Sequence, residues 1–222
     1  GRTGFPEKLT LNFKGVAGQS FGCWNSNGLD LRLEGLANDY VGKGMNGGKI
    51  VIKKNKYLQE ERSVLAGNTC LFGATGGELY VNGTVGERFA VRNSGAKAII
   101  EGSGDHCCEY MTGGEVIVLG PVGNNFGAGM TGGFAYVFDQ DRSFVDKCNK
   151  DLVAFNRITS QEMEAHRSYL KDRIHLFIKE TKSEVAREIL ADFEKFQSLF
   201  WIVTPFAENL SRIIQKTRED AA

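Results

Sequence analysis

Residues 113–121 read GGEVIVLGP, a glycine pair followed by a short run of strand-forming residues. Five further segments have this form, with a Gly-Gly, Asn-Gly or Ser-Gly pair before a run whose apolar side chains recur at every second position. They are NGLDLRLEG from Asn27, GGKIVIKKN from Gly47, GGELYVNGT from Gly76, SGAKAIIEG from Ser94 and GGFAYVFDQ from Gly132. A period of two residues is typical of β-strands with one buried face.

The six runs form a repeat along the chain. The second residue of each pair stands at 28, 48, 77, 95, 114 and 133, so the intervals are 20, 29, 18, 19 and 19 residues. The long interval contains a charged insertion at residues 53–62. The usual interval is too short for a helical repeat or a propeller blade but suits one coil of a parallel β-solenoid. A leucine-rich repeat has a similar period, but its leucine and asparagine signature is missing. We therefore predict an all-β fold, a parallel β-helix of about six coils over residues 1–141.

The paired glycines are predicted to form the corners of these coils. A coil turns sharply between its faces and its corners stack closely, and glycine meets both conditions because it has no Cβ atom. The candidate turn residues are Gly28, Gly47, Gly48, Gly76, Gly77, Gly95, Gly113, Gly114, Gly132 and Gly133. The apolar pattern is displaced by one residue in the first and fourth runs, which predicts different turns there. Residues 39–41 and 69–72 indicate a second strand-like face of the coil.

After residue 141 the pattern changes to one typical of helices. Glycine becomes rare, and apolar residues are spaced by three and four. Thr159 with Glu162 and Thr181 with Glu184 resemble capping boxes at two helix starts. We predict that residues 142–222 form a helical tail that packs on the solenoid or caps it, since an open solenoid end exposes core and backbone. The phenylalanine-rich stretch at residues 193–206 is expected to pack on the solenoid, with docking onto another domain as the alternative.

Charge and composition argue against several classes of partner. Lys and Arg together number 27, and Asp and Glu together also number 27. The chain therefore has no overall electrostatic field that would attract nucleic acid or an anionic membrane. No apolar stretch is long enough to span a bilayer, and no signal peptide opens the chain. The chain begins at Gly1 rather than methionine, which suggests a processed or partial sequence. The five cysteines include no C-x-x-C pair and are interpreted as free thiols of a cytoplasmic protein.

Two motifs resemble functional sites but are interpreted as structural. Residues 42–47 and 127–132 fit G-x-G-x-x-G, yet β-type sequence follows both, whereas a dinucleotide site needs a helix behind its glycines. Residues 105–108 read DHCC, but neighbours on a strand point to opposite faces, so His106 and Cys107 are not expected to converge. His166 and His175 are expected at the surface or flank of the tail helices. We predict no catalytic, cofactor-binding or metal-binding residue in this chain.

Four long segments resemble a known family, the glycine-rich C-terminal domain of glutamate synthase large subunits. They are GVAGQSFG at residues 15–22, LRLEGLANDYVGKGMNGGKIVI at 31–52, GELYVNGTVGERFAVRNSGAKAIIEGSGDHCCEYMTGGEVIVLG at 77–120 and NNFGAGMTGGFAYVFD at 124–139. The similarity runs from about Phe5 to Asp139 and continues more weakly to FWIVTP at residues 200–205. The resemblance implies a right-handed β-helix.

The resemblance also implies a functional context. Glutamate synthase makes L-glutamate from glutamine and 2-oxoglutarate by passing ammonia through a tunnel and reductively aminating the keto acid. Its FMN, iron–sulfur clusters and catalytic cysteine lie in other domains, and no catalytic residue of the family maps onto this sequence. The implied role is to hold the amidotransferase, central and FMN-binding domains in position, and the small subunit is a further implied partner.

Other interpretations remain open at this point. A scaffold like the glycine-repeat subunit of formylmethanofuran dehydrogenase has a similar repeat, and a separately encoded glutamate synthase subunit is also compatible with the sequence. A solenoid enzyme of the pectin lyase kind would need charged side chains converging in an exposed groove, which the sequence does not indicate. The electron donor of the parent enzyme is not indicated.

Overall fold

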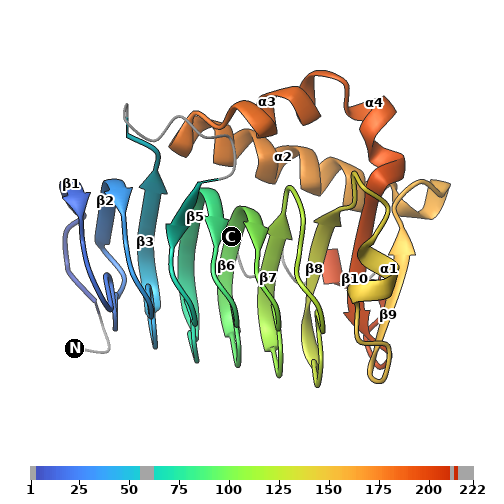
Figure 1. The fold of residues 1–222 in the computed structure, drawn as a ribbon, viewed down its shortest axis with the longest axis horizontal. Coiled ribbons are helices and arrows are strands. Elements are labelled where there is room, and N and C mark those ends of the chain that lie inside the picture. The colour runs from blue at the N-terminus through green and yellow to red at the C-terminus, as the bar shows by residue number, and fades with distance from the viewer. Residues whose placement is uncertain (1–3, 56–62, 211–212, 215–222) are drawn as a thin grey trace.

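The computed structural model describes residues 4–55, 63–210 and 213–214. Its main feature is a sheet in the order β1-β2-β3-β5-β6-β7-β8-β10-β9 (Figure 1). In addition, β4 pairs with β5. The strands that follow one another from β1 to β8 in this order are parallel. Their bounds are β1 Leu9–Val16, β2 Leu29–Leu36, β3 Asn46–Lys53, β4 Val64–Ala66, β5 Gly76–Val85, β6 Ser94–Ser103, β7 Thr112–Val118 and β8 Gly132–Phe138. This confirms the predicted parallel β-solenoid.

The six predicted runs correspond to β2, β3, β5, β6, β7 and β8. The strand β1 comes before them and was not predicted as a coil, because no glycine pair precedes it. Part of the predicted insertion, residues 56–62, lies outside the described residues. The different turns of the first and fourth runs are confirmed. Asp30 stands two residues after Gly28, yet it aligns with Lys49, which directly follows Gly48. In the same way, Lys97 stands two residues after Gly95 but aligns with Glu78, which directly follows Gly77.

The side chains of the parallel strands stack in rows on both faces. One row, Ile50, Leu79, Ala98, Val116 and Ala135, lies inside the solenoid and belongs to its core. The neighbouring row, Val51, Tyr80, Ile99, Ile117 and Tyr136, belongs to a second apolar core on the outer face. These strands therefore carry buried apolar side chains on both faces, as expected for parallel strands that are covered on both sides.

The tail supplies the cover for the outer face. Its helices are α1 Phe144–Lys147, α2 Glu164–Thr181, α3 Glu184–Ala191 and α4 Phe193–Phe196, with short 3-10 turns at Gln161–Met163 and Gln197–Leu199. Helix α2 lies across the sheet (Figure 1), and its Leu170, Ile174 and Phe177 join the outer core. In the phenylalanine-rich stretch, the rings of Phe196 and Phe200 pack against Phe138 of β8, with centroids 5.7 and 5.0 Å apart, which confirms the predicted packing for this part of the stretch, whereas Phe206 is exposed.

The tail also contains two strands, which the sequence pattern did not predict. Strand β10, Phe200–Pro205, pairs antiparallel with β8, and β9, Val153–Arg157, pairs antiparallel with β10. The backbone edge of β8 is thereby paired. The pattern of three and four residues could not reveal these strands, because their partners lie far away in the sequence.

Both predicted capping boxes are wrong. Helix α2 is preceded by a 3-10 turn, and its N-cap makes no side-chain hydrogen bond. The hydroxyl of Thr181 is still in the last turn of α2 and donates to the Phe177 carbonyl at 2.6 Å. The cap of α3 is Ser183, whose Oγ accepts from the Ala186 N–H at 3.0 Å. The cap lies closer to α3 because α2 extends through Thr181.

The expected surface position is right for His175, which is exposed, but wrong for His166, which is 1% exposed. Tyr136 and the Leu210 carbonyl lie on either side of the His166 ring, 2.7 Å from Nδ1 and 2.9 Å from Nε2. The carbonyl can only accept, so Nε2 donates to it, and in the neutral ring Nδ1 accepts from the Tyr136 hydroxyl. Burial lowers the pKa of His166.

This arrangement predicts a loss of stability in mild acid. The folded-state pKa of His166 lies below the unfolded value of about 6.5, so the unfolded chain binds the proton more readily. The free energy of unfolding should therefore fall as the pH drops from about 6.5 towards the folded-state pKa. Denaturant titrations across this range should show a weaker pH dependence in His166→Gln than in the original chain. The matched change at exposed His175 should leave the dependence unaltered; equal slopes for all three chains would contradict the prediction.

Candidate functional site

Of the candidate corner glycines, Gly28 lies in a turn, whereas the others are among the first residues of strands β3, β5, β6, β7 and β8, where consecutive coils stack. Gly114 has φ +84°, and a Cβ atom there would lie 2.7 Å from the Asn93 amide and closer still to the Ala96 carbonyl oxygen of the previous coil. The other candidate corner glycines would also meet atoms of an adjoining segment: Gly28, Gly47, Gly48, Gly76, Gly77, Gly95, Gly113, Gly132 and Gly133. These glycines are therefore engaged in contacts between backbone segments.

Both G-x-G-x-x-G segments lead into strands rather than helices. The strand β3 begins at Asn46, inside the first match, and β8 begins at Gly132, the last residue of the second. A phosphate-binding glycine loop holds its anion with the N–H groups of a following helix, and a strand does not present that group of donors. In each match the first two glycines lie in turns and the last lies in the strand.

The second face of each coil is not a regular strand. Residues 39–44 and 69–73 form consecutive turns in which every second residue has positive φ, including Tyr40 at +64° and Leu71 at +58°. These turns still form an intercoil ladder: the Tyr40 N–H donates to the Asn68 carbonyl and the Leu71 N–H to the Val41 carbonyl. The predicted second face exists, but its strand-like conformation is wrong.

The DHCC segment lies on this turn face. Cys107 and Cys108 are both buried in the solenoid core, with sulfur atoms 3.8 Å apart, because His106 and Cys108 have positive φ and the strand alternation does not apply. The ring of His106 instead lies near the Asn125 amide at 3.1 Å and the Glu109 carboxylate at 3.5 Å. Burial raises the pKa of the Cys108 thiol well above its ordinary value, which favours the unreactive thiol. Within the described ranges, no three His, Cys, Asp or Glu side chains are grouped to hold a metal ion.

A ladder of charged residues under α2 was missed by the sequence analysis. Five side chains of alternating sign occupy one register position on successive strands: Asp30, Lys49, Glu78, Lys97 and Glu115. The available signal was the charged residue one or two positions after each of the first five glycine pairs. What could not be seen locally is that the strands place these residues side by side.

Helix α2 is joined to this ladder by complementary charges. At one end, the Arg173 Nε donates to Glu115 at 3.1 Å and the Tyr169 hydroxyl donates to the same carboxylate at 2.5 Å. At the other end, Glu180 accepts from Lys49 and Arg32, both at 2.7 Å. Burial opposes ionisation of Glu180, but the hydrogen bonds and charges of Lys49 and Arg32 outweigh it and lower its pKa. The ladder therefore sets where the helix lies along the sheet.

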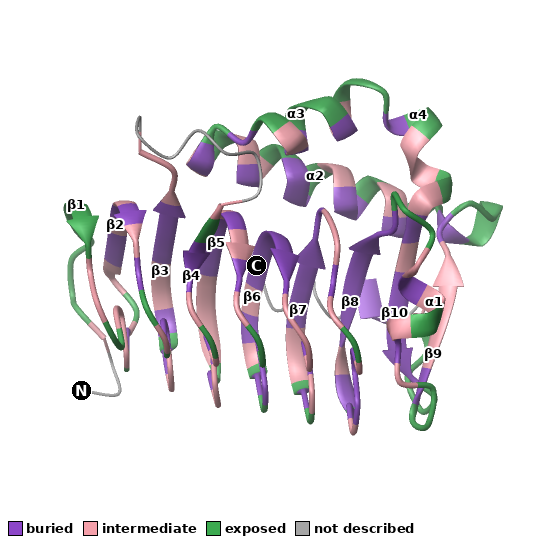
Figure 2. Cartoon of the chain, in the orientation of Figure 1, coloured by how far each residue is buried: buried purple, intermediate pink, exposed green. Residues whose placement is uncertain are grey.

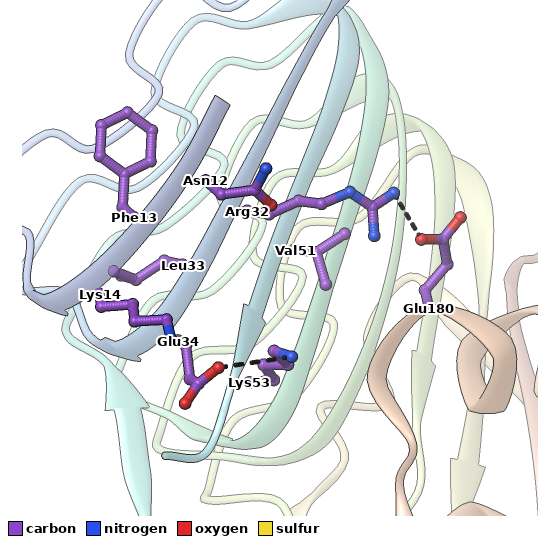
Figure 3. Close-up of a pocket in the computed structure, with 9 residues that line it drawn as sticks. All are labelled: Asn12, Phe13, Lys14, Arg32, Leu33, Glu34, Val51, Lys53 and Glu180. Atoms are coloured by element: carbon purple, nitrogen blue, oxygen red, sulfur yellow. Dashed lines mark ion pairs between the residues drawn. The ribbon is translucent and has the colours of Figure 1, made fainter. Parts of the chain in front are cut away.

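A hollow of about 110 Å³ lies beside this second ion pair, near β1 (Figure 3). Arg32 pairs with Glu180 across it, and Lys53 pairs with Glu34 at 3.6 Å. These pairs neutralise much of the charge that lines the hollow.

No helix in the described part of the chain has the length and apolar content needed to cross a membrane.

The fold and its stacked corners define a class of protein, the glycine-repeat parallel β-helices. A family model described as GXGXG motif matches residues 1–206, and the chain belongs to this family. It is 52% identical over 210 residues to ferredoxin-dependent glutamate synthase 2 of Synechocystis sp. and 51% identical over 211 residues to the chloroplastic ferredoxin-dependent glutamate synthase of Oryza sativa subsp. japonica. Each alignment covers 94% of this chain. The resemblance to glutamate synthase is thereby confirmed.

A third relative, ferredoxin-dependent glutamate synthase 2 of Arabidopsis thaliana, is 47% identical over 228 residues, covering 99% of this chain. The chain spans only 13% to 14% of the length of these three relatives. It is therefore similar to one segment of much longer enzymes. Two of the names include the word chloroplastic, and the expected cytoplasmic location stays a prediction.

Proposed function

We propose that this chain is a structural domain of a ferredoxin-dependent glutamate synthase. That enzyme makes L-glutamate from glutamine and 2-oxoglutarate by ammonia transfer and reductive amination, and the domain holds its catalytic domains in position. The observation that carries the proposal is the alignment: almost the whole chain matches, at about half identity, a segment that makes up 13% to 14% of each relative. The relatives' names favour this parent over formylmethanofuran dehydrogenase.

The architecture supports a positioning role. The parallel strands β3 and β5 to β8 are packed on both faces, their corners are in backbone contact, and α2 is joined to the sheet by the charge ladder. Such a body resists bending because its interior is close-packed. Coupled reactions at two sites depend on position, since a misplacement of about 1 Å can cost about a hundredfold in rate.

The domain's partners in this proposal are the amidotransferase, central and FMN-binding domains of the same polypeptide, with the small subunit as a further candidate. FMN and the iron–sulfur clusters belong to those other domains, and this chain binds none of them. The purified chain should neither retain FMN nor hydrolyse glutamine. Stoichiometric flavin absorbance or glutamine turnover in the purified chain would overturn this assignment.

The positioning role itself can be tested in the full-length parent enzyme. Gly114→Ala distorts a coil corner, whereas Gly73→Ala meets no atom within 4 Å and serves as the matched control. We expect the first variant to lower the yield of glutamate per glutamine hydrolysed by about tenfold or more, because transfer depends on alignment. Flavin content and glutaminase rate, measured in parallel, show whether the other domains remain intact. An unchanged yield in a variant whose solenoid is shown to be disrupted would argue against the role.

A further inference from the structure

The two ends of the solenoid differ. At the β8 end, β10 and β9 extend the sheet, and the rings of Phe126 and Phe144, the latter from α1, pack edge to face 5.4 Å apart. At the opposite end, all eight residues of β1 are exposed (Figure 2). Among the described residues, β1 pairs with β2 alone. One edge of β1 is thus left with open backbone groups.

The side chains of β1 that belong to the core row are uncovered. Leu9, Leu11 and Phe13 align with Leu29, Leu31 and Leu33 of the next coil. Their exposures are 44%, 37% and 40%, whereas Leu33 is 1% exposed. Phe5 and Trp24, also in the first coil, are exposed as well. Apolar side chains in a contiguous row at an unpaired strand edge mark an interaction site.

The turn face of the first coil is open in the same way. In the inner coils, one turn N–H donates back to a carbonyl of the previous coil: Gly42 to Phe21, Leu71 to Val41 and Ala90 to Cys70. Gly22, with φ +68°, occupies the equivalent position in the first coil, and no described residue provides a coil before it. The first coil therefore presents the backbone pattern that each inner coil satisfies with its neighbour.

We propose that the open edge of β1 binds an extended segment from another part of the synthase polypeptide, which adds a strand to the sheet and places apolar side chains against Leu9, Leu11 and Phe13. This inference rests on the proposed function. A strand is selected over a helix because the edge offers unpaired N–H and C=O groups, which an extended segment satisfies and a helix does not. The source is the same polypeptide because the relatives contain about seven times more chain than this domain, as their 13% coverage implies. The added strand would close the second end of the solenoid and tie the domain to the rest of the enzyme.

Amide hydrogen exchange tests this directly. We expect the amides of β1 that face away from β2 to exchange about a hundredfold more slowly in the full-length enzyme than in the isolated chain, because pairing protects them from solvent. The amides of β6, which pairs on both sides with β5 and β7, should exchange alike in both and serve as the internal reference. Equal exchange of β1 in the two forms overturns the proposal. It leaves the positioning role intact, since that role is measured by the yield of glutamate per glutamine.

A pair of variants adds specificity. Leu11→Asp places a charge in the core row, whereas Asn12→Asp places the same charge on the opposite face of the strand, next to Arg32. In the full-length enzyme, Leu11→Asp should restore fast exchange of β1, and Asn12→Asp should not. Restoration by both variants, or by neither, counts against the predicted contact. If the isolated chain instead has twice its mass in light scattering, with β1 protection that rises with concentration, a second copy occupies the edge and the proposal fails.

Discussion

Replacing Gly114 with alanine is expected to lower the free energy of unfolding by about 2–4 kcal/mol, from two separate causes. The left-handed backbone at φ +84° costs a residue with a Cβ atom about 1–2 kcal/mol. The new Cβ atom would also overlap the Ala96 carbonyl and approach the Asn93 amide, and overpacking of this kind costs about 1–3 kcal/mol. The gain from a less flexible unfolded chain, about 0.4–1 kcal/mol, offsets part of this loss.

Two other glycines separate the causes. Gly73 has φ +61° and open space around it, so alanine there should show the backbone cost alone. Gly95 has no positive φ but lies against the Thr75 carbonyl, so alanine there should show the steric cost alone. Denaturant titration of the three variants measures each change. Equal losses at Gly114 and Gly73 would show that coil stacking is not what requires glycine.

Replacing Arg173 with methionine is expected to destabilise the chain by about 3–5 kcal/mol, as is usual when one partner of a buried ion pair is removed. Glu115 is 1% exposed and accepts from Arg173 and Tyr169, so the substitution leaves its carboxylate without a counter-charge from the helix. Burial lowers the pKa of Arg173, but nearby negative groups, above all Glu115, raise it above its ordinary value. The measurement is the free energy of unfolding at neutral pH.

The double variant Arg173→Met/Glu115→Gln should recover much of this loss, because no unpaired charge then remains buried. Lys171→Met, on the same helix, is the matched control: its partner Glu194 is exposed, and the change should have little effect. A double variant no more stable than Arg173→Met would mean that packing of the arginine stem, rather than charge, is what α2 requires here.

The predictions that succeeded rest on repetition along the chain. Spacing of the glycine pairs and the alternation of runs such as residues 113–121 determine a parallel solenoid, because strand periodicity and turn chemistry are properties of neighbouring residues. Even the one-residue displacement at Gly28 and Gly95 was visible and corresponds to a real difference at those corners. The candidate glycines meet neighbouring coils, but except for Gly28 they are among the first residues of strands rather than parts of separate turns.

The features that the sequence did not predict depend instead on contacts between residues far apart in the chain. His166 is buried because Tyr136 and Leu210 meet it from distant segments, and Phe200–Pro205 is a strand because β8 offers it an edge. Lys49 and Glu115 form ion pairs with α2 only because the stacked strands bring them beneath this helix. The sequence by itself determined the coil and its corners, since these depend on residues close together in the chain. Only the tertiary structure decided how the tail closes one end and leaves β1 open, because those contacts join residues that are far apart in sequence.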